Sequence, residues 1–232
     1  MNLYLSLYMF KNYFFIVLLT LFCLKTSGQT KSFKKQLDSI QALRQLSKNT
    51  DLDIEARIQY AKKASELSYI TQVDSVILKT RINLAWTYMQ SKKYSRKSIK
   101  LNNENLKTAN KFNDSFSIAC INSDLGYAYH HLEKSDSAYY YYNKSLKIFK
   151  YFKSLDSNEN YINQSLILLN IAYLQKSERD YIGGQVNIIK AINLLLKTSK
   201  TEKSLQILWG LYNNLALNLD ELKEYEKYFS VL

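Results

Sequence analysis

Apolar residues recur three and four positions apart from about residue 31 onwards, in blocks of about 16 to 20 residues. This spacing gathers apolar side chains on one face of an α-helix, and no stretch shows the strict alternation that is typical of a strand. Aspartate–serine pairs stand at several block edges, where their side chains can accept hydrogen bonds from the first turn of a helix. These expected N-caps are Asp74-Ser75, Asp114-Ser115, Asp136-Ser137 and Asp156-Ser157. The pattern predicts an all-α fold.

The composition favours long helices joined by short connectors over an all-β fold. The 232 residues include five glycines and no proline, so the residues that form many tight turns are scarce. With 47% hydrophobic residues the chain can bury a sizeable core, which a disordered chain cannot.

Residues 1–28 have the features of a secretory signal peptide. An uncharged run of 12 residues, 13–24, follows Lys11, and the small residues at 26–28 are typical of a signal peptidase site. The run is shorter than the roughly 20 apolar residues that span a bilayer. Because residues 3–10 are also apolar, an uncleaved anchor is the alternative. We expect export to the periplasm or cell envelope, with membrane contact only through this segment or a region after Leu232.

The formal net charge of +12 is compatible with nucleic acid, anionic lipid or an acidic envelope polymer as a partner. Export excludes nucleic acid for this segment, and we expect the lysines to be spread over solvated helix faces. Cys23 lies in the leader, which leaves Cys120 without an intramolecular disulfide partner, so packing alone must hold the fold. Cys120 is expected to be a small buried apolar residue.

One pair of blocks matches a known repeat closely. The matching residues are Leu125, Gly126, Tyr129, Ala138, Tyr142, Ser145 and Leu146. They resemble the tetratricopeptide repeat (TPR), which has Leu-Gly-x-x-Tyr on a first helix, and Ala, Tyr and a small-Leu pair on a second.

Three further units match the repeat in part. The unit before carries Leu84, Ala85, Tyr88 and Tyr94, and then Ser98, Asn102 and Leu106 if one residue is inserted. The unit after carries Ile171, Ala172, Tyr181, Gly184, Ile188, Ala191 and Ile192, with Gln175 in place of the first-helix tyrosine. The last carries Leu215, Ala216 and Tyr225. An opening pair of helices, 33–46 and 52–69, is degenerate.

The anchor positions 84, 125, 171 and 215 are 41, 46 and 44 residues apart. Compared with the usual repeat of about 34 residues, each helix is longer by about a turn. The resemblance implies a right-handed α-solenoid of antiparallel helix pairs, with about four to five repeats over residues 31–232. Because Leu232 falls within about two turns of the start of the last second helix, that repeat is incomplete and we expect further sequence to follow.

The resemblance assigns packing roles to small and aromatic residues. Small residues are expected where the two helices of a unit cross, at Ala85, Gly126, Ala172 and Ala216. Aromatic residues are expected to open each second helix, at Tyr94, Tyr181 and Tyr225. Contacts with the next unit are expected from Ala138, Gly184 and Ala191.

TPR arrays bind a protein or peptide partner in a groove lined by first helices, and the resemblance implies the same here. The groove side chains would follow each anchor by two places, with a second row one turn further on. They are Trp86, Tyr127, Tyr173 and Leu217, and then Met89, His130, Lys176 and Asp220. The alternative is that these rings fill the interior of the solenoid.

Polar residues precede the anchors, as in family members that bind carboxylates. They are Asn83, Asp124, Asn170 and Asn214. The basic companions of such a carboxylate clamp are not evident. A ladder of hydrogen bonds between neighbouring helices is the simpler explanation of these residues.

The sequence predicts neither catalysis nor a metal or cofactor. His130 and His131 are the only histidines, and neighbouring helical residues point about 100° apart, which is unsuitable for chelating one ion. Gly183-Gly184 is not followed by a phosphate-loop pattern, and no nucleophile, base and orienting acid can be proposed.

Long-repeat TPR regions behind a signal peptide resemble the extracytoplasmic parts of bacterial sensor kinases and helix-turn-helix regulators. We therefore expect the sensory or interaction region of a signalling protein. The alternative is a free periplasmic scaffold for assembly. Sequence beyond Leu232 distinguishes the two.

Overall fold

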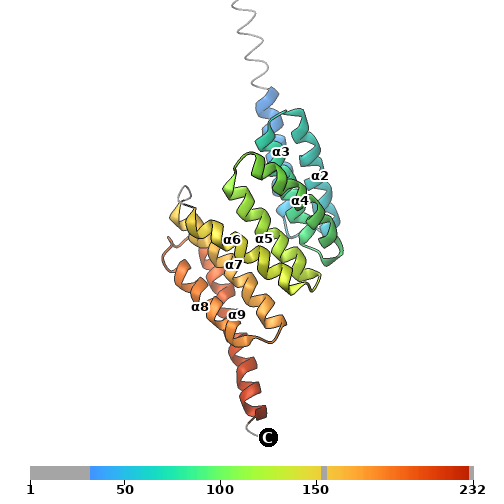
Figure 1. Cartoon of the computed structure of the whole chain (residues 1–232). Coiled ribbons are helices and arrows are strands. Elements are labelled where there is room, and N and C mark those ends of the chain that lie inside the picture. Colours follow the sequence, from blue (N-terminus) through green and yellow to red (C-terminus); the bar gives the residue numbers. More distant parts are fainter. Residues whose placement is uncertain (1–31, 153–155, 230–232) are drawn as a thin grey trace, which may run out of the picture. The chain divides into compact units, whose positions relative to one another are not determined.

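A computed structural model describes residues 32–152 and 156–229 of the chain (Figure 1). The described residues form helices and short connectors without any strand, which confirms the predicted all-α class. The expected signal peptide, residues 1–28, lies outside the described residues. The chain divides into two compact units, Met1–Thr80 and Arg81–Leu232, and the division falls within α3 (Asp74–Met89).

The first unit contains a helix over residues 32–48 and α2 (Ile54–Ile70), followed by the beginning of α3. These two helices agree with the expected opening pair at 33–46 and 52–69. Their contact includes a buried hydrogen bond, in which Arg57 Nε donates to the carbonyl oxygen of Ser47 at 3.1 Å. None of the helices in the described part of the chain is long and apolar enough to cross a membrane.

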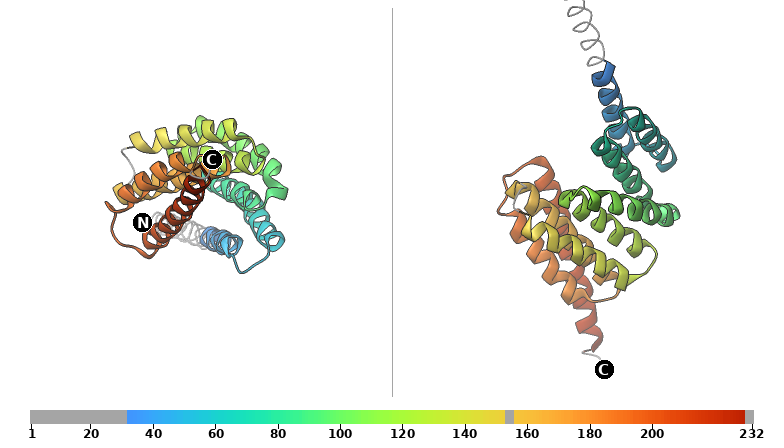
Figure 2. Two further views of the ribbon diagram at one scale, coloured as in Figure 1. Left: turned by 90° about the horizontal axis from the view of Figure 1, so that it is seen from below. Right: turned by 45° about the horizontal axis from the view of Figure 1, so that its top comes forward.

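The second unit continues from α3 through a 3₁₀ turn and six helices that run alternately in opposite directions (Figures 1 and 2). They are η1 (Lys92–Tyr94), α4 (Ser95–Lys111), α5 (Ser115–His131), α6 (Ser135–Tyr151), α7 (Ser157–Ser177), α8 (Tyr181–Leu195) and α9 (Glu202–Phe229). From α4 onwards each helix packs against the next along the chain. The first helices α5, α7 and α9 also contact one another in that order.

The second helices α4, α6 and α8 bury the same face, at spacings of four, three and four residues. The buried residues are Ser98, Asn102, Asn105 and Ala109, then Ala138, Tyr142, Ser145 and Phe149, then Gly184, Ile188, Ala191 and Leu195. The expectation for α4 was wrong at one position, because the structure buries Asn105 and leaves Leu106 half-buried. The buried positions continue from Ser98 at regular helical spacing. The repeat pattern would bury Leu106 only if one residue were inserted before it.

The first and second helices of a pair approach closely at Gly126, where a small residue was predicted. A Cβ atom added to Gly126 would lie 2.6 Å from Cδ1 of Tyr142, so the tyrosine ring rests directly on the α5 backbone. Ala85 and Ala172 are likewise buried on the first helices α3 and α7. These positions are the places where first and second helices meet.

Two pairs share a hydrogen bond between helices at equivalent positions. Ser145 Oγ of α6 donates to the carbonyl oxygen of Ala119 in α5 at 2.7 Å. Ser165 Oγ of α7 donates to the carbonyl oxygen of Ala191 in α8 at 3.0 Å. Each residue of the second contact lies 46 positions after its equivalent in the first, although the serine has moved to the other helix. Only a small side chain on the partner allows a serine to reach a main-chain carbonyl.

The expectation for the last unit was wrong. Helix α9 continues through Tyr225, where the repeat pattern placed the start of a second helix. Ala216 is exposed instead of buried at a helix crossing, because no described helix packs over it. The helix does not end before Tyr225 because no helix-breaking residue separates the two expected helices.

Aspartate N-caps begin several helices. Those whose carboxylate accepts from a first-turn N–H are Asp53, Asp114, Asp156 and Asp180. Asp114 and Asp156 were predicted. Asp74 and Asp136 were predicted as caps, but they lie inside the first turns of α3 and α6, where a negative charge still favours the helix.

The connectors use non-glycine residues in the left-handed region. These are Gln72, Asn113, Glu133 and Arg179, with φ between 52° and 65°. After α5, the Lys134 N–H donates to the Tyr129 carbonyl at 3.0 Å, and after α7 the Asp180 N–H donates to the Gln175 carbonyl at 2.9 Å. This six-to-one hydrogen bond closes the helix end. The chain therefore makes tight connectors although glycine is scarce.

Candidate functional site

The predicted groove residues differ in exposure along the row of first helices. On α3, Met89 is buried and Trp86 is half-buried. On α5 Tyr127 is half-buried, whereas Tyr173 on α7 is 42% exposed and Leu217 on α9 is 51% exposed. Met89 therefore belongs to the interior, and the side chains available to a partner lie toward α7 and α9.

Two of the predicted aromatic residues are held by neighbouring side chains. The Tyr127 ring meets the His131 ring edge-on, with centroids 4.5 Å apart. Asn214 Nδ2 donates to the Tyr173 hydroxyl at 2.8 Å and also to the carbonyl of Gly210 at 2.8 Å. The bond between α7 and α9 is one rung of the predicted hydrogen-bond ladder. It fixes the Tyr173 ring while leaving much of it exposed.

The predicted polar row is not gathered at one place. His130 and Lys176 are half-buried, and Asp220 is exposed. His130 lines a cleft of about 520 Å³ at the ends of α5 and α7, together with His131 and Glu178. Burial lowers the pKa of both imidazoles, which favours their neutral forms.

The row of asparagines contains one buried acid. Asp124 on α5 is buried, and desolvation raises its carboxyl pKa from 3.8 to about 8. Burial, followed by the charge of Asp124, raises the pKa of the Cys120 thiol to about 12. Cys120 packs against the apolar cluster of α5, α6 and α7, and its thiol stays protonated. Cys120 therefore packs as expected, although it is half-buried and not fully buried.

The small residues of the second helices contact the next unit where this was expected. Ala138 joins a buried cluster with Ile167 and Ile171 of α7, and Ala191 joins one with Leu211 of α9. A Cβ atom on Gly184 would lie 2.9 Å from Asn218 Nδ2 of α9. Gly183-Gly184 therefore lies inside α8 as a packing feature.

A second cleft was missed by sequence reasoning. It has a volume of about 610 Å³ and lies between α6 and α8, with α7 as its floor. Three lysines line it, namely Lys150, Lys190 and Lys197. All three are exposed, as expected, but they share the lining of one cleft. No local pattern could have revealed it, because Lys150 and Lys190 lie 40 positions apart and meet only through the packing of three helices.

No group of three His, Cys, Asp or Glu side chains in the described parts of the chain could hold a metal ion. The side chains gathered on the first helices and around the second cleft instead offer rings, amides and ammonium groups. Such groups hold a ligand through packing, hydrogen bonds and charge.

These features define the class of the protein as an all-α chain of helical repeat-like build. Its fold is similar to that in the crystal structure of BtubC (BKLC) from P. vanneervenii, with a TM-score of 0.50 and 13% sequence identity over 87% of this chain and 92% of that chain. At this identity the likeness concerns the fold alone. No protein-family model matches the sequence, and no curated protein matches it.

Proposed function

We propose that this chain is an exported α-solenoid of the TPR type that binds a protein or peptide partner on its first helices. The observation that carries the proposal is the exposure of large side chains at equivalent positions on α7 and α9. Tyr173 is 42% exposed and Leu217 is 51% exposed, although each follows a buried or half-buried anchor residue by two places. Exposed apolar side chains aligned on neighbouring helices are typical of interaction surfaces.

The TPR type is supported by the shared register of the helix pairs. The α5–α6 and α7–α8 pairs bury equivalent residues 46 positions apart, including Gly126 and Ala172 on the first helices. On the second helices Ala138 and Gly184 provide the small residues of the family pattern. A right-handed solenoid is the arrangement that stacks such pairs and buries their apolar faces.

The binding surface can be tested with a phage-displayed library of short peptides selected on the purified chain. Affinity of a selected peptide is then measured by fluorescence anisotropy for the wild type and for Tyr173→Ala combined with Leu217→Ala. We expect a loss of about tenfold or more with unchanged circular dichroism. Tyr140→Ala is the matched control, since Tyr140 is 57% exposed on α6. Equal affinity of the double variant and the wild type would contradict the proposal.

The wider role that we propose is the sensory or interaction region of a signalling protein. It rests on the resemblance of long-repeat TPR regions behind a signal peptide to bacterial sensors. An alkaline phosphatase fusion after residue 232 tests export, because the enzyme is active only outside the cytoplasm. Activity that disappears when residues 1–28 are deleted supports export, and activity lacking in both fusions contradicts it. Downstream kinase or DNA-binding motifs after a membrane helix would favour the sensor over a free periplasmic scaffold.

A further inference from the structure

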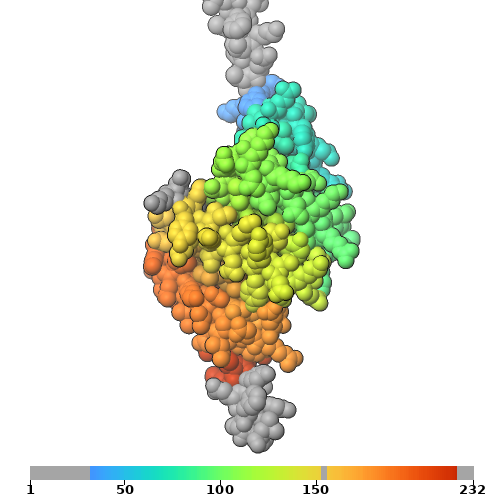
Figure 3. Space-filling view, in the orientation of Figure 1, coloured from blue at the N-terminus to red at the C-terminus, as the bar shows by residue number. Residues whose placement is uncertain are grey.

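The cleft between α6 and α8 has an apolar floor and polar walls. Its apolar lining consists of Leu146, Leu168, Ile171 and Leu194, of which Leu168 and Ile171 of α7 form the floor. The walls carry side-chain amides, of which Asn143 and Asn193 are exposed. In the space-filling view, side chains of α6 (yellow) and α8 (orange) reach the same face of the molecule (Figure 3). We call this site the α6–α8 cleft.

One end of the α6–α8 cleft is closed by hydrogen bonds that engage the nearby acids. The Tyr139 hydroxyl donates to Glu178 Oε2 at 2.8 Å, and Gln175 Nε2 donates to Asp180 Oδ2 at 2.8 Å. Asn187 Nδ2 donates to Gln175 Oε1 at 2.7 Å, which ties α8 to α7. These hydrogen bonds preorganise the side chains, and they hold the carboxylates of Glu178 and Asp180 at the closed end of the cleft.

The other end is basic. Lys150 stands three turns after Tyr139 on α6, about 16 Å away along the helix. Lys197 follows α8, with Lys190 between it and the closed end, and all three lysines are exposed. No Asp or Glu lines the cleft. Lys150 and Lys197 contact the rings of Tyr151 and Tyr161, and no carboxylate lines the cleft beside them. Anionic groups are therefore attracted to this end.

The dimensions and the amides fit a peptide main chain. A length of about 16 Å accommodates about five extended residues at about 3.3 Å each. Side-chain amides both donate and accept hydrogen bonds, which matches the alternating N–H and C=O groups of an extended peptide. The apolar floor accepts alternate side chains of such a segment.

We propose that the α6–α8 cleft binds a short acidic peptide segment in extended conformation. Apolar side chains of the segment rest on Leu168 and Ile171, and its carboxylates pair with Lys150 and Lys197. The site is separate from Tyr173 and Leu217, so it provides a second binding surface beyond the proposed function. Two surfaces on one α7 allow a single chain to hold two segments.

The test uses a fluorescent peptide that alternates glutamate and leucine, with a glutamine–leucine peptide as its neutral match. Anisotropy is measured with the full chain. We expect the acidic peptide to bind about tenfold more tightly than the neutral one, with affinity falling as salt rises. The double variant Lys150→Glu with Lys197→Glu should weaken the acidic peptide by at least about tenfold. The matched control, Lys144→Glu with Lys147→Glu, makes the same charge change on exposed residues of α6 outside the cleft and should retain the affinity.

Equal loss in both double variants would overturn the proposal, because net charge rather than the cleft would then hold the peptide. Equal binding of the neutral peptide would also overturn it. A thymidine oligonucleotide of the same charge serves as a further probe. If it binds more tightly than the acidic peptide, and if the Lys150→Glu and Lys197→Glu variant loses this binding, the cleft would be assigned to nucleic acid instead. Tyr173→Ala with Leu217→Ala should leave acidic-peptide binding unchanged, so failure of this proposal and failure of the first-helix proposal can be told apart.

Discussion

The second helices α4 and α8 bury the same four positions with opposite chemistry. In α8 all four are small or apolar, whereas in α4 three of the four are polar. The residues are Gly184, Ile188, Ala191 and Leu195 in α8, and Ser98, Asn102, Asn105 and Ala109 in α4. The difference teaches that the helix pairs bury the same positions along each helix, whereas the residue types at those positions vary.

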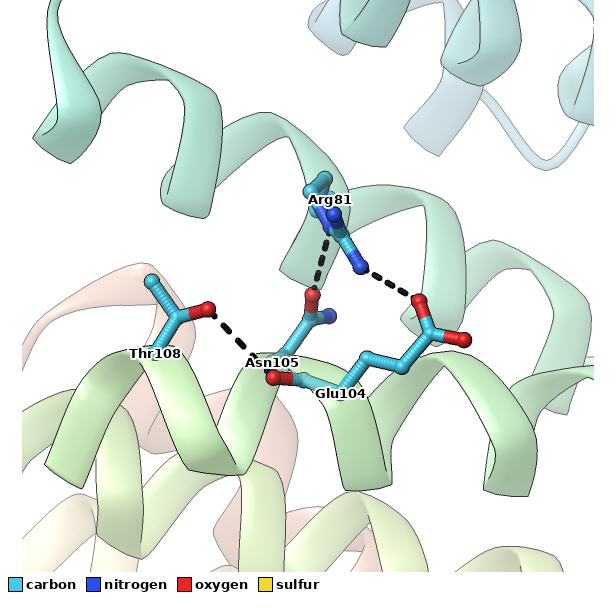
Figure 4. A network of polar contacts seen from close by, with 4 residues as sticks. All are labelled: Arg81, Glu104, Asn105 and Thr108. Atoms are coloured by element: carbon cyan, nitrogen blue, oxygen red, sulfur yellow. Dashed lines mark hydrogen bonds and ion pairs between the residues drawn. The ribbon is translucent and has the colours of Figure 1, made fainter. Parts of the chain in front are cut away.

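Helix α4 replaces apolar packing with directed polar contacts. Arg81 of α3 donates from Nε to Asn105 Oδ1 at 2.9 Å, and its terminal nitrogen lies 2.7 Å from Glu104 Oε2 (Figure 4). Ser98 Oγ donates to the carbonyl oxygen of Ala85 at 2.9 Å. In the same figure, the Thr108 hydroxyl donates to the Glu104 carbonyl at 3.4 Å. These contacts require exact side-chain geometry, which apolar packing does not.

The polar interior of α4 has a cost. Asn102 is fully buried, and its Oδ1 has no hydrogen-bond partner among the described residues. A buried polar atom without a partner destabilises the fold by about 1–3 kcal/mol. At the equivalent position, Ile188 joins an apolar cluster that includes Leu168 and Leu211. The packing of α8 against its neighbours should therefore be more stable than the packing of α4.

The largest effect is expected when α8 is given the chemistry of α4. Ile188→Asn places an amide in an apolar cluster without partners, and the free energy of unfolding should fall by about 4 kcal/mol. Urea denaturation followed by circular dichroism measures the change. Ile182→Asn is the matched control, because Ile182 is 67% exposed on the same helix, and its effect should stay within about 0.5 kcal/mol. Equal losses at both positions would refute the assignment of Ile188 to the core.

Gly126→Leu tests the shared register in the α5–α6 pair, which lies between α4 and α8 along the chain. Its side chain would collide with the Tyr142 ring, which occupies the position of Asn102 and Ile188 on the other second helices. The free energy of unfolding should fall by about 3 kcal/mol, seen as a lower melting temperature. Gly210→Leu is the control, since a Cβ atom there meets nothing within 4 Å. An unchanged melting temperature of Gly126→Leu would count against the alignment of the repeats.

The first helices show a similar contrast, since Asp124 stands where the other units have asparagine. Its pKa is raised from 3.8 to about 8 in the folded chain, so the folded state binds more protons than the unfolded state between these values. Stability therefore falls as pH rises from about 4 to about 8. Asp124→Asn should remove this pH dependence and raise the melting temperature at pH 8 above that of the wild type.

Melting temperatures measured from pH 4 to pH 8 provide the check. Asp136→Asn is the control, because Asp136 is exposed in the first turn of α6 and should leave the pH dependence as in the wild type. If Asp124→Asn retains the wild-type slope, the carboxyl of Asp124 is not the group responsible.

The smallest effect is expected when α4 is given the chemistry of α8. Asn102→Leu removes the buried oxygen that has no partner and fills similar space, so the free energy of unfolding should rise by about 1 kcal/mol. Asn103→Leu, at an exposed position of α4, should change it by less than about 0.5 kcal/mol. A loss of stability in Asn102→Leu would show that the polar interior of α4 is needed for its packing.

Local patterns predicted the parts of the fold that local chemistry determines. Periodicity located the helices, aspartates at 114 and 156 located two helix starts, and Gly126 located a close crossing of two helices. The start of a helix and a close approach each depend on a few residues near in sequence. Their signals are therefore readable without the tertiary structure.

Features that depend on neighbouring helices could not be predicted in the same way. The pattern around Leu106 misassigned the buried face of α4, because a polar residue, Asn105, occupies the inner position. The exposure of Ala216 follows from the uninterrupted course of α9, which the spacing up to Tyr225 does not determine. The lysines of the α6–α8 cleft converge from separate helices, so only packing brings them together.

The central claim is that successive helix pairs repeat one packing register. A crystal structure of the chain tests it most directly, by superposing α5–α6 on α7–α8 with an offset of 46 residues. The account predicts that Gly126 falls on Ala172, Tyr142 falls on Ile188, and the serine–carbonyl contact of one pair falls on that of the other. Pairs that cross at different positions, so that these residues do not coincide, would contradict it.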